Sequence, residues 1–271
     1  MAPDHPSTRF QELGFLLDMD GTLYLDNSPL KGAIEFLEFL YKQKIPFCLV
    51  TNNSSESRDR YVTRLETMGF LIRREQILTS GVATIVYLKR KEISRVYLLG
   101  TPALESEFED GGIQMTSSNP EAVVLSFDKT LSYEKLEIAH HLLLKGIPYI
   151  ATHPDLVCPT LEGSIPDCGA FISLFKASTS RDPVVIGKPS HLLVELAADL
   201  MKEGERQFMM VGDRLYTDME MGKRAGILTA LVLSGEATLE DVERWGSQPD
   251  FVFEGVFEIL ARLKMEMNDA G

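Results

Sequence analysis

Residues 13–22 read LGFLLDMDGT, a short apolar run followed at once by two carboxylates, a glycine and a threonine. The run Leu13–Leu17 is typical of a buried β-strand, and the residues after it are typical of a loop. Because alternate residues of an extended segment point to the same side, Asp18 and Asp20 are expected to face one site. Two close carboxylates repel each other unless a cation or unequal pKa values relieve them. A solvated turn explains the same residue types, so this stretch indicates a functional site without proving one.

The same pattern recurs along the chain. Apolar runs at Phe47–Val50, Val184–Ile186 and Phe208–Val211 are followed by Thr51, Lys188 and Asp213. Further strands are predicted at Leu228–Leu233 and Asp250–Phe253, and helices at Ala33–Tyr41, Ser190–Met201 and Val256–Met267. Strands that alternate with helices predict an α/β fold with a doubly wound, Rossmann-like parallel sheet. Ligands bind at the carboxyl ends of such strands, where these polar residues are expected.

A second, smaller α/β domain is predicted inside the first. Thr51 and Lys188 are 137 residues apart, far more than one strand–helix–strand crossover needs. We expect a core domain formed by residues 1–78 and 183–271 and an inserted cap domain at residues 79–182. The insert has its own predicted elements, which are strands at Arg95–Leu99, Ala122–Ser126 and Pro148–Ala151 and helices at Pro102–Phe108 and Tyr133–Leu144.

The amino-acid composition excludes some classes of binding partner. The 271 residues include 27 Lys and Arg against 40 Asp and Glu, a formal charge of -13. Such a surface repels nucleic acid and anionic membranes, so neither is an expected partner. The three cysteines form no CxxC pair, and no apolar run approaches the length of a membrane span, which together predict a cytoplasmic protein. An anionic substrate would need a metal ion or a few well-placed cations.

Several polar residues at predicted strand ends are candidates for binding phosphate. Gly21 permits a tight turn whose N–H groups cradle an anion. Thr51 and Asn52 can donate hydrogen bonds to a phosphoryl group, although Thr and Asn are equally common in loops and helix N-caps. Lys188 can neutralise negative charge, although most lysines are simply exposed.

Asp213 and Asp218 are candidates for binding a metal ion. Magnesium prefers oxygen ligands and takes one or two carboxylates beside substrate phosphate and water. Asp218 has a second interpretation, because Thr217 and Glu220 fit a capping box and an aspartate in the first turn favours the helix dipole.

The segments DMDGT, TNN, GKP and GDRLYTD, in this order, resemble the four motifs of the haloacid dehalogenase superfamily. The long insert resembles the C2-type cap of the NagD-like phosphatases of subfamily IIA. The resemblance implies that Asp18 is the nucleophile and that Asp20 is the general acid and base. It implies that Thr51 and Asn52 hold the phosphoryl group and that Lys188 stabilises its charge. Magnesium would be bound by Asp18, the main-chain carbonyl of Asp20, Asp213 and Asp218.

The implied activity is magnesium-dependent hydrolysis of small organic phosphate monoesters, including para-nitrophenyl phosphate, through a phospho-aspartate on Asp18. Asp20 separates the chain from the dehalogenases proper, which lack this residue and the metal. A phosphomutase and a phospho-accepting regulatory domain remain alternatives. The expected partner is a small phosphorylated metabolite, and the sequence is compatible with a monomer or a homo-oligomer. In the cap, Thr152, His153 and Asp155 are the candidates for contacting substrate.

Overall fold

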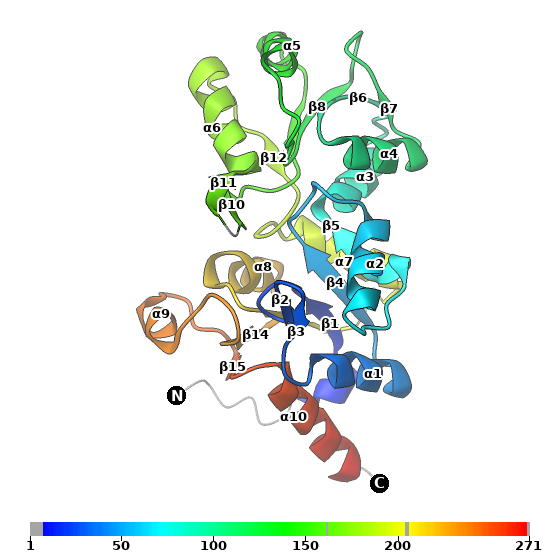
Figure 1. The fold of residues 1–271 in the computed structure, drawn as a ribbon, viewed down its shortest axis with the longest axis vertical. Helices are drawn as coiled ribbons and strands as arrows, with labels where there is room; N and C mark the ends of the chain where they lie inside the picture. The colour runs from blue at the N-terminus through cyan, green and yellow to red at the C-terminus, as the bar shows by residue number, and fades with distance from the viewer. Residues whose placement is uncertain (1–7, 161, 204–205, 270–271) are drawn as a thin grey trace. The chain divides into compact units, whose positions relative to one another are not determined.

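The structure, a computed structural model, describes residues 8–160, 162–203 and 206–269. The chain folds into two compact units. The first unit comprises Met1–Val50, Asp59–Leu78 and Pro189–Gly271, and the second comprises Thr51–Arg58 and Thr79–Lys188. Figure 1 labels their helices and strands in chain order.

The first unit is built on a six-stranded sheet with the strand order β15-β14-β13-β1-β4-β5. Its strands are β1 (Gly14–Leu17), β4 (Phe47–Thr51), β5 (Ile77–Thr79), β13 (Phe208–Gly212), β14 (Leu228–Val232) and β15 (Phe251–Phe253). From β15 to β4, each strand runs parallel to its neighbour. β1, β4 and β13 are buried along their whole length, as expected for a parallel sheet that helices cover on both faces. The predicted parallel α/β core is confirmed.

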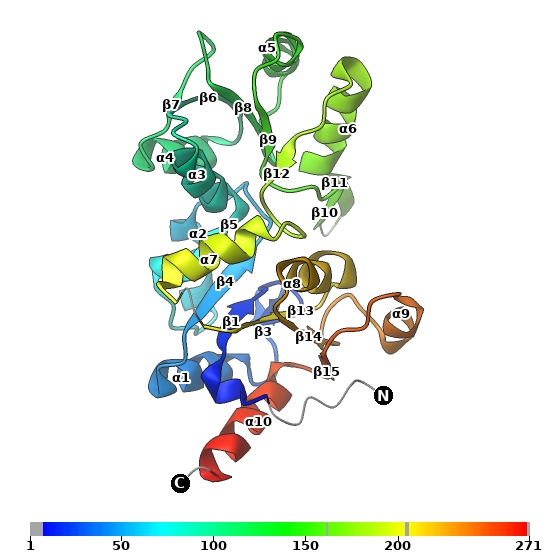
Figure 2. The same ribbon diagram turned by 180° about the vertical axis from the view of Figure 1, so that it is seen from behind.

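The apolar faces of the helices explain how this sheet is covered. On α1, the buried Phe36, Leu37 and Leu40 recur at helical spacing, and the Phe36 ring meets Phe15 of β1 edge to face, with centroids 5.9 Å apart. α1 packs against α10, and α7 packs against α8. Figure 2 shows α7 and α8 in front of the strands. The helices and remaining elements of this unit are η1 (Phe10–Glu12), the β2 (Tyr24–Leu25) and β3 (Ser28–Pro29) hairpin, α1 (Ala33–Gln43), α2 (Arg58–Thr67), η2 (Arg74–Gln76), α7 (Leu192–Met201), a single π-turn η3 (Leu215–Met219), α8 (Glu220–Ala225), α9 (Leu239–Arg244) and α10 (Val256–Asp269).

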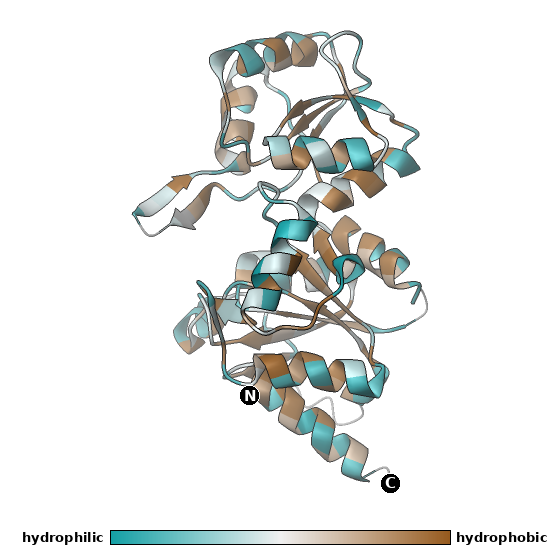
Figure 3. Cartoon of the chain, turned by 45° about the vertical axis from the view of Figure 1, so that its right-hand side comes forward, coloured by the Kyte–Doolittle hydropathy of each residue, from teal (hydrophilic) through white to brown (hydrophobic). Residues whose placement is uncertain are grey.

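The second unit has a parallel five-stranded sheet with the order β12-β9-β8-β6-β7. Its strands are β6 (Arg95–Leu99), β7 (Gln114–Met115), β8 (Ala122–Leu125), β9 (Tyr149–Ala151) and β12 (Val184–Val185), and its helices are α3 (Ser80–Arg90), α4 (Pro102–Asp110), α5 (Tyr133–Leu144) and α6 (Cys168–Thr179). A two-stranded antiparallel hairpin, β10 (Val157–Thr160) and β11 (Gly163–Pro166), extends away from this sheet in Figure 3.

One strand belongs to a different sheet from the one expected. Residues 183–271 were predicted to continue the core, but β12 pairs with β9 of the second unit, Val184 opposite Ile150 and Val185 opposite Ala151. The physical reason is that a short apolar run fits any parallel sheet, and nothing in the run specifies its neighbour. The assignment of residues 79–182 as a substrate-specificity cap stays a prediction.

Among the described residues, none of the helices combines the length and the apolar character that crossing a membrane requires.

Candidate active site

Three carboxylates meet where β1 and β13 end. β1 and β13 lie side by side with Leu17 opposite Val211, and the N–H of Asp18 donates to the Val211 carbonyl at 2.9 Å. Asp18 and Asp213 therefore leave the same edge of the sheet. One oxygen each from Asp18, Asp213 and Asp218 lies within 4.8 Å of the others, and all three residues are buried. Three of the four residues predicted to bind metal thus come together.

Asp213 is held in a cradle of main-chain atoms. The N–H of Glu236 donates to Asp213 Oδ2 at 2.7 Å, and the N–H of Ala237 donates to the Asp213 carbonyl at 3.1 Å. Glycines allow this close approach from two sides. A Cβ atom would lie 2.3 Å from Asp213 Oδ2 if placed on Gly21, and 2.0 Å if placed on Gly235. The carboxylate can therefore reach its place only because both positions lack a side chain.

Asp218 lies in the carboxylate cluster and also bonds to the main chain of its own turn. The capping box predicted from Thr217 and Glu220 is not formed, because Met219 is the N-cap residue of α8 and its side chain makes no cap bond. The Oδ2 atom of Asp218 accepts a hydrogen bond of 3.1 Å from the N–H of Arg214, the residue that precedes the π-turn Leu215–Met219. Single π-turns are frequent at functional sites. A Cβ atom on Gly212 would lie 2.4 Å from the Asp218 carboxyl carbon, so the last residue of β13 must be small. Asp218 caps this turn and at the same time lies in the carboxylate cluster.

Asp20 lies outside that cluster, on the turn that follows Asp18. Gly21 has a φ of 77°, and its N–H donates to the Tyr24 carbonyl at 2.8 Å, so the predicted tight turn is confirmed. The Tyr24 hydroxyl donates to Asp20 Oδ2 at 3.3 Å. Asp20 is exposed when the whole residue is counted, but protein atoms surround its carboxyl group and keep water from it. This loss of hydration, together with the neighbouring Asp18 carboxylate, raises the pKa of Asp20. A carboxyl group with a raised pKa keeps its proton to a higher pH, which suits the role of proton donor.

Arg214 is a cation at this site that sequence reasoning did not single out, although it lies inside the quoted GDRLYTD segment. Its Nε atom lies 2.9 Å from Glu236 Oε2. Burial alone would lower the pKa of Arg214, but the carboxylates of Asp18 and Asp213 more than offset this and raise it. Arg214 therefore stays charged beside the cluster. In the sequence, Arg214 is only one charged residue in a short polar loop, which does not indicate this role. Its place becomes evident once β13, which precedes it, is paired with β14, which precedes Glu236.

The cluster suits a hard divalent cation. Asp18, Asp213 and Asp218 supply carboxylate oxygens, the donors that such ions prefer, and the glycines around Asp213 fix one of these donors in place. Three buried carboxylates this close together repel one another, and a divalent cation bound between them would relieve that repulsion.

Thr51, Asn52 and Lys188 lie in the second unit. Thr51 is the last residue of β4, and its hydroxyl accepts from the N–H of Asn53 at 3.2 Å. The Asn52 side chain bonds to both the N–H and the carbonyl of Lys188, at 2.7 Å and 3.0 Å. Any phosphate contact from Asn52 would therefore come from its main chain. Lys188 is buried, unlike the exposed lysine that was the alternative.

The three candidates for contacting substrate have other partners in the structure. Thr152 and His153 are fully buried, with Thr152 Oγ1 2.9 Å from His153 Nδ1 and His153 Nε2 2.9 Å from Asp167 Oδ1. The Asp155 carboxylate accepts from the Asn52 side chain. Their predicted contact with substrate stays a prediction, and these bonds also give each residue a structural role.

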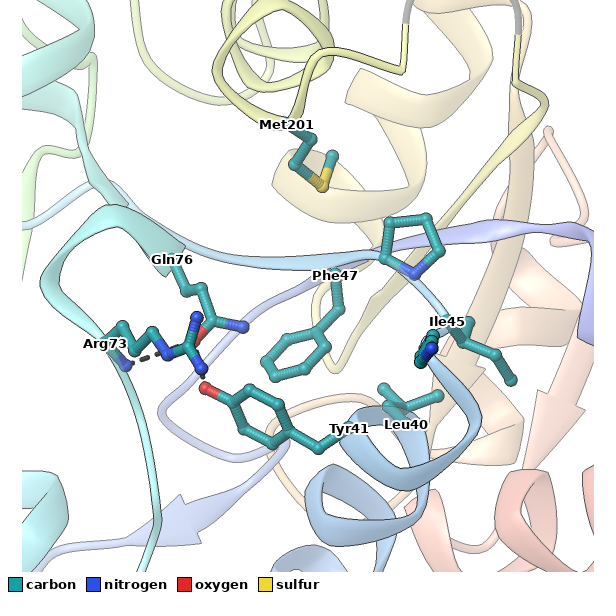
Figure 4. A pocket seen from close by; sticks show the side chains of 9 residues that line it. Leu40, Tyr41, Ile45, Phe47, Arg73, Gln76 and Met201 are labelled. Atoms are coloured by element: carbon teal, nitrogen blue, oxygen red, sulfur yellow. Dashed lines mark hydrogen bonds between the residues drawn. The ribbon is translucent and has the colours of Figure 1, made fainter.

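A cavity of about 300 Å³ in the first unit lies elsewhere (Figure 4). It is lined by Leu40, Tyr41, Lys44, Ile45, Pro46, Phe47, Arg73, Gln76 and Met201. Gln76 links two other lining residues, since its side-chain oxygen accepts from the Tyr41 hydroxyl and from the N–H of Arg73. Because Phe47 is the first residue of β4, the cavity lies at the amino end of that strand. The carboxylates follow the carboxyl ends of β1 and β13, so this cavity is separate from the candidate active site.

Comparison with known protein families gives two matches. Residues 15–114 match the model described as haloacid dehalogenase-like hydrolase, and residues 185–259 match a second model, described as HAD-hydrolase-like. The two matches include every candidate in the carboxylate cluster.

Individual relatives match almost the whole chain. The acid sugar phosphatase of Staphylococcus haemolyticus is 32% identical over 93% of this chain and 96% of its own length. The 4-nitrophenylphosphatase from Thermotoga maritima is 46% identical, with a TM-score of 0.88 over 93% of this chain and 98% of its own. NagD from E. coli K-12 is 30% identical, with a TM-score of 0.84 over 90% of this chain and 96% of its own.

Proposed function

Because this chain belongs to the haloacid dehalogenase-like hydrolases, we propose that it is a magnesium-dependent phosphatase that hydrolyses small organic phosphate monoesters. The observation that carries the proposal is the meeting of Asp18, Asp213 and Asp218 at the ends of β1 and β13. Phosphoryl transfer demands mainly positioning and charge neutralisation, and a carboxylate cluster that holds a divalent cation supplies both.

In the proposed reaction, an oxygen of Asp18 attacks the phosphorus atom, and the bond between phosphorus and the ester oxygen breaks. Asp20 gives its proton to the departing alkoxide, a step that the raised pKa of Asp20 supports. Asp20 then accepts a proton from water as this water attacks the phospho-aspartate. Phosphate leaves and Asp18 is regenerated. Bound magnesium would reduce the repulsion between the Asp18 carboxylate and the phosphate dianion.

The remaining candidates have supporting roles in this proposal. Asp213 and Asp218 would bind the metal together with Asp18 and the Asp20 carbonyl. The N–H groups beside Gly21, the Thr51 hydroxyl and the main chain of Asn52 would hold the phosphoryl oxygens. Lys188 would balance their charge as the phosphoryl group is transferred.

The names of the relatives support a substrate class. An acid sugar phosphatase and a 4-nitrophenylphosphatase both act on phosphate monoesters of small alcohols or phenols. We propose a small phosphorylated metabolite, with sugar phosphates first, as the natural substrate and para-nitrophenyl phosphate as an artificial one. In this proposal residues 79–182 act as the cap, the protein works in the cytoplasm, and neither nucleic acid nor membrane is a partner; a charge of -13 supports the last two points.

The experiment that tests the proposal measures phosphate release from para-nitrophenyl phosphate and from a panel of sugar phosphates and nucleoside monophosphates, with and without magnesium. Multiple turnovers that stop on chelation and return with magnesium are expected. Asp18→Asn should abolish turnover and leave the unfolding temperature near that of the wild type. A phospho-accepting regulatory domain would release at most one phosphate per chain, and a phosphomutase would return a rearranged ester instead of phosphate.

A further inference from the structure

The side chain of Asn52 takes the place of a strand residue beside Lys188. β12 pairs with β9, and beyond β12 the N–H groups of Ile186 and Gly187 continue to the carbonyls of Ala151 and Thr152, at 3.1 Å and 2.7 Å. The next N–H, that of Lys188, donates to Asn52 Oδ1 at 2.7 Å. Asn52 Nδ2 returns a bond of 3.0 Å to the Lys188 carbonyl. Asn52 therefore holds both main-chain polar groups of Lys188.

Asp155 fixes which way the Asn52 amide points. Asn52 Nδ2 also donates to the two carboxylate oxygens of Asp155, at 3.2 Å and 3.1 Å. An ionised carboxylate can only accept hydrogen bonds. A flipped amide would place its oxygen against the carboxylate and its NH₂ group against the Lys188 N–H. Asp155 therefore stabilises the one orientation that binds Lys188.

The residues on either side of Lys188 suit this arrangement. A Cβ atom on Gly187 would lie 2.5 Å from Asn52 Oδ1 and 2.6 Å from the Thr152 carbonyl, so the approach of the amide requires glycine there. Pro189 has no N–H and cannot extend the ladder further. Behind the amide, the Asn52 carbonyl accepts from the Ser80 hydroxyl, which anchors the residue to the start of α3.

We propose that Asp155 is a positioning residue that acts through Asn52 on Lys188. The inference rests on the proposed function, because Lys188 matters for catalysis only if it balances phosphoryl charge. In this reading Asp155 does not contact the substrate. Its carboxylate orients the Asn52 amide, the amide holds the Lys188 main chain, and the place of the ammonium group follows from that. A displacement of about 1 Å in such a group can cost about 100-fold in rate.

The test is a double-mutant cycle with magnesium and para-nitrophenyl phosphate. Asp155→Ala should lower kcat by about 10- to 100-fold with little change in KM. Lys188→Ala should lower kcat further, and adding Asp155→Ala to it should then cost almost nothing, because the residue through which Asp155 acts is gone. Asp155→Asn keeps an acceptor oxygen and should recover most of the rate. The matched control is Asp182→Ala, which removes an exposed aspartate of the same unit that pairs with Lys176.

Hydrogen exchange gives a readout that does not depend on activity. In Asp155→Ala the Lys188 N–H should exchange faster, while the Gly187 N–H, bonded to the Thr152 carbonyl, stays protected. Losses that multiply in the double variant, or unchanged kcat and exchange in Asp155→Ala, would overturn the inference. If the wild type releases no phosphate, the proposed function fails, and the exchange measurement still decides whether Asp155 holds Lys188.

Discussion

The main-chain N–H of Glu236 donates a hydrogen bond of 2.7 Å to Oδ2 of Asp213. The loop after β14 therefore fixes a carboxylate that follows β13. Because an N–H group can only donate, Asp213 Oδ2 is the acceptor in this bond, which holds the carboxyl group in one orientation. The hydroxyl of Ser234 in the same loop donates to the Gly21 carbonyl at 2.7 Å, so the loop also holds the turn after Asp18. The loop after β14 thus holds both Asp213 and the turn that follows Asp18.

Gly235→Ala should damage this arrangement. The new Cβ atom would lie 2.0 Å from Asp213 Oδ2, so either the loop or the carboxylate must move. Disturbing the groups that orient a metal ligand typically costs 10- to 100-fold, and we expect the magnesium concentration needed for half-maximal activity to rise by about tenfold or more. A magnesium titration of phosphatase activity measures this. The control is Gly246→Ala, at an exposed glycine with open space around the new methyl group. Equal titration curves for Gly235→Ala and the wild type would contradict the claim that Asp213 needs a glycine at this position.

Asp20→Asn separates metal binding from proton transfer. The amide keeps the shape of the carboxyl group and can still accept from the Tyr24 hydroxyl, but it can neither donate the required proton nor take one from water. We expect hydrolysis of an alkyl phosphate to slow by about 10²–10⁴-fold, with the magnesium requirement unchanged.

The leaving group supplies the control for this variant. Para-nitrophenolate departs without a proton more easily than an alkoxide does, so its release as the phospho-aspartate forms should be slowed less. Rapid-mixing kinetics with the two substrates compare the first turnover. An equal loss for both would argue against Asp20 as the general acid.

The polar ends of the core strands could be predicted because each apolar run stops abruptly. Leu17 precedes Asp18, and the run before Asp213 ends in the same way, so residues 195 apart were expected at one edge of the sheet. The parallel pairing of β1 and β13 confirms it. The reason is that burial of a strand on both faces leaves a clear hydrophobic signal.

Contacts made by single polar groups could not be predicted in this way. Asn52 and Asp155 are 103 residues apart, and their bond depends on how two loops approach. The hydroxyl of Thr79 accepts from the N–H of Val82 and caps α3, although a threonine followed by Ser and Gly fits a turn equally well. Local residue types do not distinguish a cap from a turn, and tertiary packing decides.

Asp218→Asn tests whether this residue binds metal as well as capping its turn. The amide oxygen can still accept from the N–H of Arg214, so the turn should persist, but one negative charge of the cluster is lost. We expect weaker magnesium activation, by about 10- to 100-fold, with little change in the unfolding temperature. Isothermal titration with magnesium and thermal unfolding measure the two effects. Asp110→Asn, at an exposed aspartate, is the control. A loss of stability with unchanged magnesium affinity would leave Asp218 with the capping role alone.

Glu121→Gln should make the stability of the chain less dependent on acid pH. Hydrogen bonds from the N–H groups of Ser94 and Arg95 to Glu121 Oε2, at 2.8 Å and 2.9 Å, lower the pKa of this carboxyl group below its usual value. A lowered folded-state pKa means that the ionised group stabilises the fold above the unfolded-state pKa of about 4.3 and that this contribution is lost as the pH falls through the folded-state value. The variant should therefore be less stable than the wild type at neutral pH, and the difference should vanish in acid. Denaturant unfolding at a series of pH values measures it, with Glu137→Gln, on the exposed face of α5, as the control. A stability difference that stays constant down to the most acid pH would mean that the charge of Glu121 contributes nothing.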